Sequence, residues 1–164
     1  MKNTKLYTKR LVLEGLNLSH SEAVVGFRSR EEVYKYFKNP HKISIEEHNA
    51  WFENRYLADE TRLDFVIKLE SSGEIVGTCG ISDLNISGGS MEVSYLLAPD
   101  FQGKGYASEA VNALIEYGFL KWGIKCVFAT IHKDNKPSIK FIEKLNFQLV
   151  NTDGDFLEYR YDRD

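Results

Sequence analysis

The sequence predicts a single α/β domain of the α+β kind, in which a mixed β-sheet carries helices on its faces. The chain has 164 residues, close to the usual size of one domain. Its composition, 43% hydrophobic and 27% charged residues, is that of a folded globular protein and excludes disorder. The periodicity of its apolar residues gives three strands in series and then strands that alternate with helices. That order is typical of a mixed sheet covered by helices.

The N-terminal third is predicted to contain one strand and three helices. In the strand, residues 10–14, charged and aliphatic side chains alternate. Helices are predicted at residues 19–27, 31–37 and 44–58. The third begins with a capping box, in which the Ser44 hydroxyl accepts from the third helical N–H and the Glu47 carboxylate reaches back to the cap.

The middle of the chain is predicted to contain three consecutive strands. They lie at residues 65–69, 75–81 and 91–98. The polar turn at 71–74 makes the first two a hairpin. A polar loop at 83–90 separates the second from the third, which Pro99 ends.

The C-terminal part is predicted to alternate helices with strands. The longest helix begins at Ala107 and ends at Trp122, because its apolar residues recur at i, i+3, i+4 and i+7 over four turns. The remaining elements are a strand at 126–131, a helix at 137–145 and a hairpin of residues 147–150 and 156–161 around Asp153-Gly154.

Charge and hydropathy narrow the class of protein. The net charge is −3, without the basic surplus of a dedicated nucleic-acid binder. Cys79 and Cys126 form no CxxC pair, which favours reduced thiols. No stretch approaches about 18 consecutive apolar residues and no signal-peptide core follows Met1, so we expect a cytoplasmic protein that contacts no membrane. The four histidines are scattered, and no metal is predicted.

The segment most informative about function runs from Leu96 to Ala107. A strand ends there, Gly103-Lys104-Gly105 follows, and the longest helix begins at once. Backbone N–H groups at a helix N-terminus form an anion site, and glycines allow a phosphate to approach the main chain. The alternative is a glycine-rich turn that only connects strand and helix. The P-loop pattern is absent, and Ser108 departs from the dinucleotide fingerprint GxGxxG.

The pattern Gln102-x-x-Gly105-x-Ala107 resembles the acetyl-CoA pyrophosphate loop of the GNAT family of N-acetyltransferases. The resemblance covers nearly the whole chain: residues 8–13 look like the opening strand of the ribosomal-protein alanine acetyltransferase-like branch, and residues 134–147 like the family's second signature. It implies one N-acetyltransferase domain over residues 1–164. In this fold a mainly antiparallel sheet of about seven strands splays between strands 4 and 5 to admit acetyl-CoA. The activity implied is direct acetyl transfer to a primary amine.

The resemblance also implies which residues bind the cofactor. Leu96 and Leu97 would pair their backbone with the pantetheine arm, as an added strand does. The pyrophosphate loop would comprise Gln102, Gly103, Lys104, Gly105, Tyr106, Ala107 and Ser108. Asn135 would bond to the pantetheine arm and Ser138 would support it, although helix capping is the alternative for both. Lys104, Lys133 and Lys136 would meet the nucleotide phosphates or remain solvated.

Acyl transfer to an amine needs a base for the ammonium proton and an acid for the leaving thiolate. Glu92, on the strand that faces the cleft, is the candidate base acting through water, with a strand-edge salt bridge as the alternative. Many family members carry a tyrosine where this chain has Ile142, which donates no proton. Tyr95 or Tyr106 is therefore the candidate acid, with water as the alternative.

The helix after Ser44 is the candidate roof of the acceptor pocket. Residues 44–52 also resemble aminosugar-nucleotide N-acetyltransferases that modify flagellin-sugar precursors. His48 and Trp51 are the candidate substrate-binding residues. The alternative makes Trp51 and Phe52 core contacts and His48 an exposed polar residue. A small molecule or an aminosugar nucleotide is the favoured acceptor; a protein N-terminal α-amine and a non-catalytic acyl-CoA-binding module remain open, as do monomer and homodimer.

Overall fold

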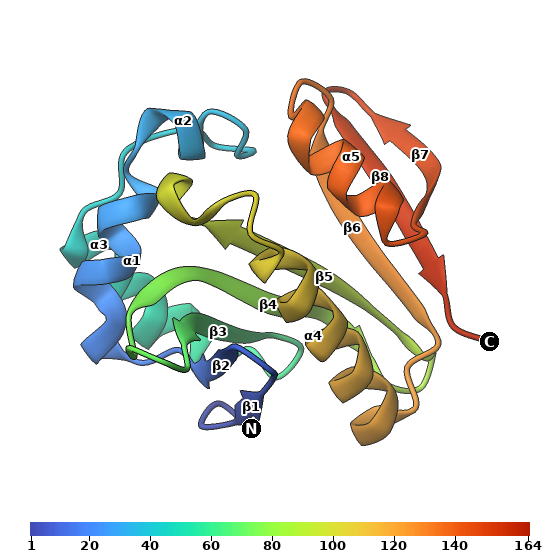
Figure 1. The fold of residues 1–164 in the computed structure, drawn as a ribbon, viewed down its shortest axis with the longest axis horizontal. Coiled ribbons are helices and arrows are strands. Elements are labelled where there is room, and N and C mark those ends of the chain that lie inside the picture. Colours follow the sequence, from blue (N-terminus) through green and yellow to red (C-terminus); the bar gives the residue numbers. More distant parts are fainter.

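Eight strands form one sheet in the order β1-β2-β3-β4-β5-β6-β8-β7 in the computed structural model, which describes residues 1–164 (Figure 1). The strands are β1 (Lys5–Tyr7), β2 (Leu11–Gly15), β3 (Leu63–Leu69), β4 (Ile75–Asn85), β5 (Ser90–Leu97), β6 (Cys126–His132), β7 (Gln148–Asp153) and β8 (Phe156–Asp162). Only β5 and β6 pair in parallel; every other neighbouring pair is antiparallel. The predicted mixed, mainly antiparallel sheet is confirmed, with eight strands where about seven were expected.

Five helices accompany the sheet: α1 (Ser21–Arg28), α2 (Glu31–Tyr34), α3 (Ile45–Trp51), α4 (Tyr106–Trp122) and α5 (Lys136–Lys144). The Ser44–Glu47 capping box is present at the start of α3. A π-helical turn, η2 (Phe52–Tyr56), extends α3 nearly to the predicted end at Ala58. The second predicted helix is shorter than expected and ends at Tyr34.

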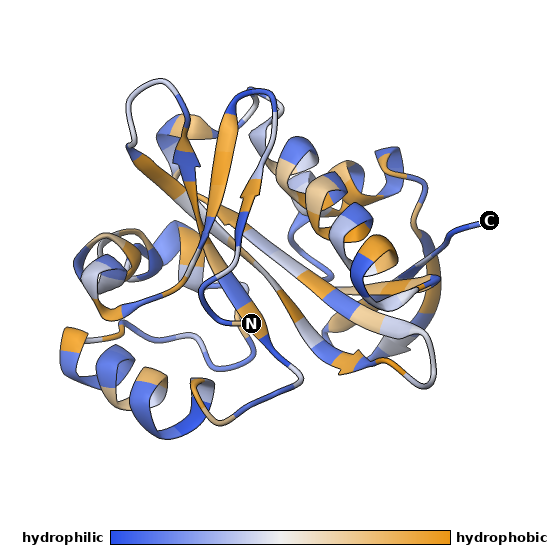
Figure 2. Ribbon diagram, turned by 90° about the horizontal axis from the view of Figure 1, so that it is seen from below, coloured by the Kyte–Doolittle hydropathy of each residue, from blue (hydrophilic) through white to orange (hydrophobic).

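The two faces of the sheet bury different helices because alternate side chains of a strand point in opposite directions. On β3, Phe65 and Ile67 belong to the large core that includes residues of α4, whereas Val66 belongs to a smaller core with α1 and η2. Figure 2 shows hydrophobic colour along the central strands and mixed colour on the helices around them. The predicted placement of helices on both faces is therefore confirmed.

The long helix α4 lies directly against β5. A side chain at Gly118 would place its Cβ 2.6 Å from the Met91 sulfur, so the absence of one allows this close approach. Because Met91 belongs to β5 and Gly118 to the C-terminal half of α4, this contact fixes the helix along the strand. The N-terminus of α4 is thereby held near the end of β5.

The parallel pair β5–β6 is paired over only three residue positions, Ser90↔Cys126, Met91↔Val127 and Glu92↔Phe128. Beyond Glu92, β5 stays paired with β4 as far as Leu97, and β6 stays paired with β8 as far as His132. The two strands therefore separate toward their C-terminal ends (Figure 1). The predicted splay is present here. Its two strands, the fourth and fifth of the prediction, are β5 and β6 of the structure, because β1 was not predicted. The splay leaves one edge of β5 without a strand partner.

The close approach of β4 and β5 gives a stability prediction. A Cβ at Gly77 would lie 2.1 Å from the carbonyl oxygen of Leu96. Gly77→Ala forces these strands apart and is expected to destabilise the protein by about 1–3 kcal/mol, as overpacking does. The measurement is the free energy of unfolding in denaturant.

The control is Gly26→Ala in α1, where a Cβ meets no atom within 4 Å. Alanine there favours the helix, so stability should rise by about 0.5–1 kcal/mol. Equal and small effects of the two substitutions would contradict the packing described between β4 and β5.

Candidate functional site

The loop between β5 and α4 has the backbone geometry of an anion-binding turn. Gly103 and Gly105 have φ angles of +77° and +81°, in the left-handed region that favours glycine. Gly105 is the N-cap of α4, and no side chain caps the helix there. The N–H groups of the first turn, which no helical carbonyl can satisfy, are therefore available to a ligand.

Arg10 supports this loop from the N-terminal segment. Its Nη1 donates to the carbonyl oxygen of Lys104 at 2.9 Å, and its Nε donates to Glu109 Oε2 at 2.8 Å. Its guanidinium also lies 4.6 Å from the centre of the Tyr106 ring. Sequence reasoning missed this role, although Arg10 lies within residues 8–13 that carried the resemblance. The loop shape thus depends on a residue about a hundred positions away.

Glu109 is the acidic partner of that support. Burial raises the pKa of its carboxyl, but hydrogen bonds from the Thr8 hydroxyl and from Arg10 outweigh burial and leave the pKa below its usual value. Both the Arg10 side chain and its backbone N–H donate to this carboxylate. The carboxylate therefore stays ionised and holds the Thr8–Arg10 turn against α4.

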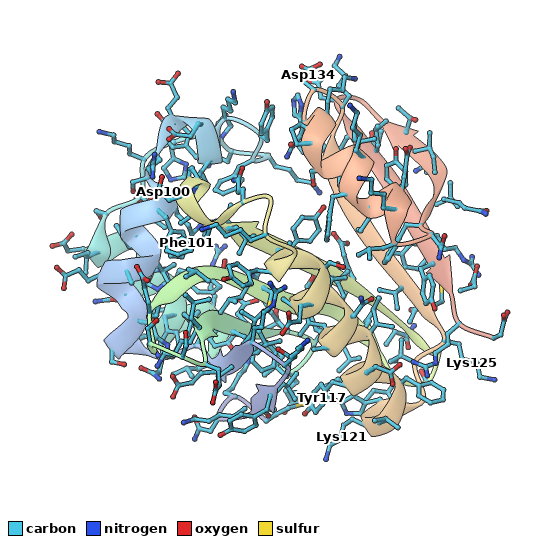
Figure 3. The ribbon with its side chains drawn as sticks, viewed as in Figure 1. Asp100, Phe101, Tyr117, Lys121, Lys125 and Asp134 are labelled. Carbon is cyan, nitrogen blue, oxygen red and sulfur yellow. The ribbon has the colours of Figure 1, made fainter.

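The other predicted loop residues lie at its entrance and in the first turn of α4. Gln102 donates through Nε2 to the carbonyl oxygen of Leu97 at 3.2 Å and so ties the loop to the end of β5. Lys104 is exposed, with its Nζ 5.4 Å from the centre of the Phe101 ring. Tyr106, Ala107 and Ser108 are half-buried. In Figure 3, Asp100 and Phe101 mark the turn before α4, and Asp134 lies across the splay from them.

On the α5 side of the splay, Asn135 caps a helix, which was the alternative to its predicted role in binding the pantetheine arm. This residue is the N-cap of α5, and its side chain accepts from the Ser138 N–H at 3.4 Å. Lys133 pairs with Asp155 at 2.8 Å, and Lys136 donates to the carbonyl oxygen of Lys133. Both lysines are thus engaged with the protein.

Tyr95 bridges the splay from β5 to α5. Its hydroxyl is 2.5 Å from Ser138 Oγ, and its ring meets Phe141 edge-on at 4.7 Å. Burial raises the pKa of Tyr95 to about 12, which keeps the phenol protonated at neutral pH. Ile142, where many family members carry tyrosine, is fully buried in the large core.

Glu92 lies on β5 at the last position paired with β6. None of the ion pairs in the structure involves Glu92, so the structure does not support the predicted alternative of a strand-edge salt bridge. Burial raises the pKa of its carboxyl, Asp83 and Glu158 add to this rise, and Thr130 and Lys38 oppose it. A raised pKa brings a carboxylate closer to the range useful for a general base.

A cavity of about 200 Å³ lies under α1 and α3, on the face of the sheet opposite to the face that α4 covers. Its walls come from α1, α3, the segment before β3, and the strands β3, β4 and β5. The helices contribute Arg28, His48 and Trp51 to the lining, and the strands contribute Asp64, Ser94 and Leu96. Ser94 and Leu96 alternate with Glu92 along β5, so all three point to this face. The cavity thus ends at the strand that borders the splay, while Glu92 lies beside it without lining it.

The structure brings both predicted acceptor residues, His48 and Trp51, to this cavity. The alternative that His48 is an exposed polar residue was wrong. Its side chain is only 1% exposed, because this face of α3 packs toward the sheet. Neither ring nitrogen of His48 has a hydrogen-bond partner. Trp51 stacks on Tyr56 at 5.3 Å, whereas Phe52 is a core residue, as its alternative expected.

Two further structural findings concern ligands and membranes. No group of three or more histidine, cysteine, aspartate or glutamate side chains is arranged to hold a metal ion. None of the helices combines the length and the apolar character needed to cross a bilayer.

Comparison with known proteins agrees with this geometry. The model of the acetyltransferase (GNAT) domain family matches residues 10–148. An uncharacterised N-acetyltransferase, p20, from Bacillus licheniformis is 32% identical over 145 residues, which cover 87% of this chain and 82% of that protein.

Solved structures share the fold at lower identity. A spermidine N-acetyltransferase from Vibrio cholerae, in complex with CoA and spermine, has a TM-score of 0.83 at 18% identity over 95% of this chain and 97% of that one. A ribosomal L7/L12 α-N-protein acetyltransferase in complex with CoA has a TM-score of 0.84 at 18% identity, over 98% and 99% of the two chains. The family model covers most of the chain, and the Bacillus licheniformis relative is similar to it over most of the length of both proteins. The chain therefore belongs to the GNAT family and is an N-acetyltransferase.

Proposed function

We propose that this N-acetyltransferase transfers the acetyl group directly to the primary amine of a small molecule held in the cavity under α1 and α3. The observation that carries the proposal is the position of this cavity: its walls include Trp51 and Phe37 as well as Ser94 and Leu96 of β5, the strand that borders the splay. At about 200 Å³ it is smaller than pockets that hold drug-sized ligands, roughly 300–1,000 Å³. The nucleotide of an aminosugar nucleotide would therefore have to lie outside it.

The splay and the glycine loop are the proposed cofactor site. The unpaired edge of β5 at Leu96 and Leu97 offers backbone groups to the pantetheine arm, as a sheet edge does to an added strand. The loop from Gln102 to Ser108 offers the free N–H groups of α4 to the pyrophosphate. Asn135 and Ser138 border the same arm from α5. The thioester of acetyl-CoA supplies an activated acetyl carbon for the amine.

Proton transfer is assigned to two side chains of β5. Glu92 removes the ammonium proton through a water molecule, and its raised pKa supports this role. The free amine then forms a C–N bond with the acetyl carbon while the C–S bond breaks. Tyr95, protonated at neutral pH, gives its proton to the departing thiolate. The attacking nitrogen loses its second proton as the amide forms, and that proton restores the Tyr95 phenol through solvent. Because its hydroxyl already bonds to Ser138, the phenol is held at a fixed point in the splay.

A non-catalytic acyl-CoA-binding module is the second candidate. The observation that favours it is Ile142, an apolar and fully buried residue where many family members carry tyrosine. A measurement of turnover distinguishes the acetyltransferase from the non-catalytic module. Wild-type protein is incubated with acetyl-CoA and a panel of primary amines, and free CoA is measured with a thiol reagent.

The expected result is CoA release that depends on the amine, together with calorimetric binding of acetyl-CoA. Ligand at a hundred times its Kd should also stabilise the fold by about 2.7 kcal/mol. Binding without turnover on any amine would favour the non-catalytic module. A protein that neither binds acetyl-CoA nor is stabilised by it would overturn both candidates.

Gly105→Val tests the loop. A valine side chain would occupy the phosphate approach, would strain a residue at φ +81°, and would place its Cβ 3.2 Å from Arg10 Nη2. We expect the Kd of CoA and the KM of acetyl-CoA to rise by orders of magnitude while the fold stays largely intact.

Gly73→Val is the matched control, because Gly73 has a φ of +74° in the β3–β4 turn and no atom near its Cβ position. It shares the backbone strain but lies away from the loop. Equal losses of CoA affinity in both variants would count against the loop as the pyrophosphate site.

Glu92→Gln tests the base. We expect kcat to fall by about 10²–10⁴-fold with the KM of acetyl-CoA unchanged, and the loss to shrink at high pH, where the amine is already neutral. In the wild type, kcat should fall as pH drops through the raised pKa of Glu92, because a protonated carboxyl accepts no proton.

The control is Glu60→Gln, an exposed carboxylate outside the cavity and the splay. It should leave the pH profile unchanged. If kcat of Glu92→Gln equals that of the wild type across this profile, the general-base role is wrong and solvent removes the proton.

A further inference from the structure

The cavity under α1 and α3 contains a cation that the protein leaves unpaired. Arg28, the last residue of α1, lines the cavity. Its guanidinium carbon lies 5.2 Å from the centre of the Phe37 ring, and the side chain forms no ion pair or hydrogen bond. Carboxylates pair with Arg10, Arg30, Arg62, Arg160 and Arg163, and Arg55 is exposed. Burial lowers the pKa of Arg28, with Asp64 opposing the shift. A partly buried guanidinium without a carboxylate is costly unless an anion reaches it.

His48 gives a second, independent observation in the same cavity. Its side chain is 1% exposed, and both of its ring nitrogens lack a hydrogen-bond partner. Leaving a buried polar group unsatisfied costs about 1–3 kcal/mol. Because no protein group meets the imidazole, a ligand in the cavity is the partner that its nitrogens can bind.

The charges of the other lining residues leave Arg28 uncompensated. Asp64 is paired through Oδ2 with Arg62 Nε at 2.8 Å, and it attracts Arg28 without forming an ion pair with it. Burial raises the pKa of the Asp64 carboxyl, so Asp64 adds at most the one negative charge that Arg62 offsets. Burial and Arg28 both lower the pKa of His48, which keeps the imidazole neutral. Tyr95 and the buried thiol of Cys79 are also neutral, because burial raises their pKa values. The cavity therefore carries one net positive charge.

Resting on the proposed function, we propose that the acceptor is a small amine that also carries an anionic group, a carboxylate or a phosphate, and that Arg28 binds this group with His48 donating beside it. Arg28 comes from α1, whereas Ser94 and Leu96 come from β5. With its anion on Arg28, the acceptor extends across the cavity and presents its amine toward the splay. A polycation such as spermidine would meet like charge here.

The alternative role for Arg28 is structural, because a cation in the last turn of α1 also stabilises the helix dipole. The experiment must therefore separate anion binding from support of the fold. It uses Arg28→Ala, Arg28→Lys and the exposed control Arg55→Ala, each with its melting temperature measured.

Matched amines isolate the anionic group. The pairs are β-alanine against β-alaninamide, and phosphoethanolamine against ethanolamine; spermidine is the cationic probe. In the wild type, kcat/KM should be at least tenfold higher for the member of one pair that carries the anionic group. That pair shows whether the site prefers a carboxylate or a phosphate. Spermidine should be a poorer substrate than the preferred anionic amine.

Arg28→Ala should lower kcat/KM for the preferred anionic amine by about 10- to 100-fold, as expected for a lost charge-assisted hydrogen bond. The neutral partner should change by less than about threefold. Arg28→Lys should recover part of the loss, and Arg55→Ala should match the wild type. Equal losses for both members of the pair, or a wild-type preference for the neutral amines or spermidine, would overturn the proposal.

A binding measurement without acetyl-CoA keeps this inference distinct from the proposed function. The probes are β-alanine and phosphoethanolamine. The one that is the preferred substrate should shift the NMR signals of the His48 ring in the wild type but not in Arg28→Ala. A shift without turnover would support the anion site and count against acetyl transfer there. No shift with either probe would overturn the anion site, even if other amines are acetylated.

Discussion

The separation of β5 from β6 after Glu92 is the constraint on which the rest of the structure depends. Each strand keeps its partner on the other side, β4 for β5 and β8 for β6, so the sheet divides without losing its remaining hydrogen bonds. Contacts of Tyr95 with Ser138 and Phe141 bridge the two sides near α5. The exposed edge of β5 is therefore held in place by the sheet itself, which limits the conformational entropy lost when a ligand binds there.

The helix α4 relates this edge to the glycine loop. Close packing of Gly118 on Met91 fixes α4 along β5, and the Arg10–Glu109 pair fixes its N-terminus against the N-terminal segment. The loop that joins β5 to α4 has little freedom, because Gly103 and Gly105 adopt left-handed backbone angles and Gln102 bonds to the end of β5. Proposed pantetheine and pyrophosphate contacts thus share one rigid support.

Local patterns in the sequence predicted most elements and the glycine loop, but not the assembly of the cavity. β1 was missed because its three residues are too short to show an alternation. β4 extends to Asn85, beyond its predicted end, through an irregularity at Asp83, whose φ is +48°. Polar residues there concealed the strand.

Local sequence patterns could not predict which residues line the cavity. Helical spacing placed His48 and Trp51 on neighbouring faces of α3, but which face turns toward the sheet depends on tertiary packing. Arg28 and Asp64 had no local signal at all, because they come from elements far apart in the chain and acquire meaning only as neighbours in the cavity. Arg10 was similar: its partner Glu109 lies in another element.

In the proposed cofactor site, the free edge of β5 and the glycine loop bind acetyl-CoA together. Amide hydrogen exchange of the wild-type protein with and without CoA tests it most directly. CoA is expected to slow exchange at residues 93–97 and 103–108 and to leave exchange in the β7–β8 hairpin unchanged. Protection confined to other segments, or to only one of these two, would contradict it.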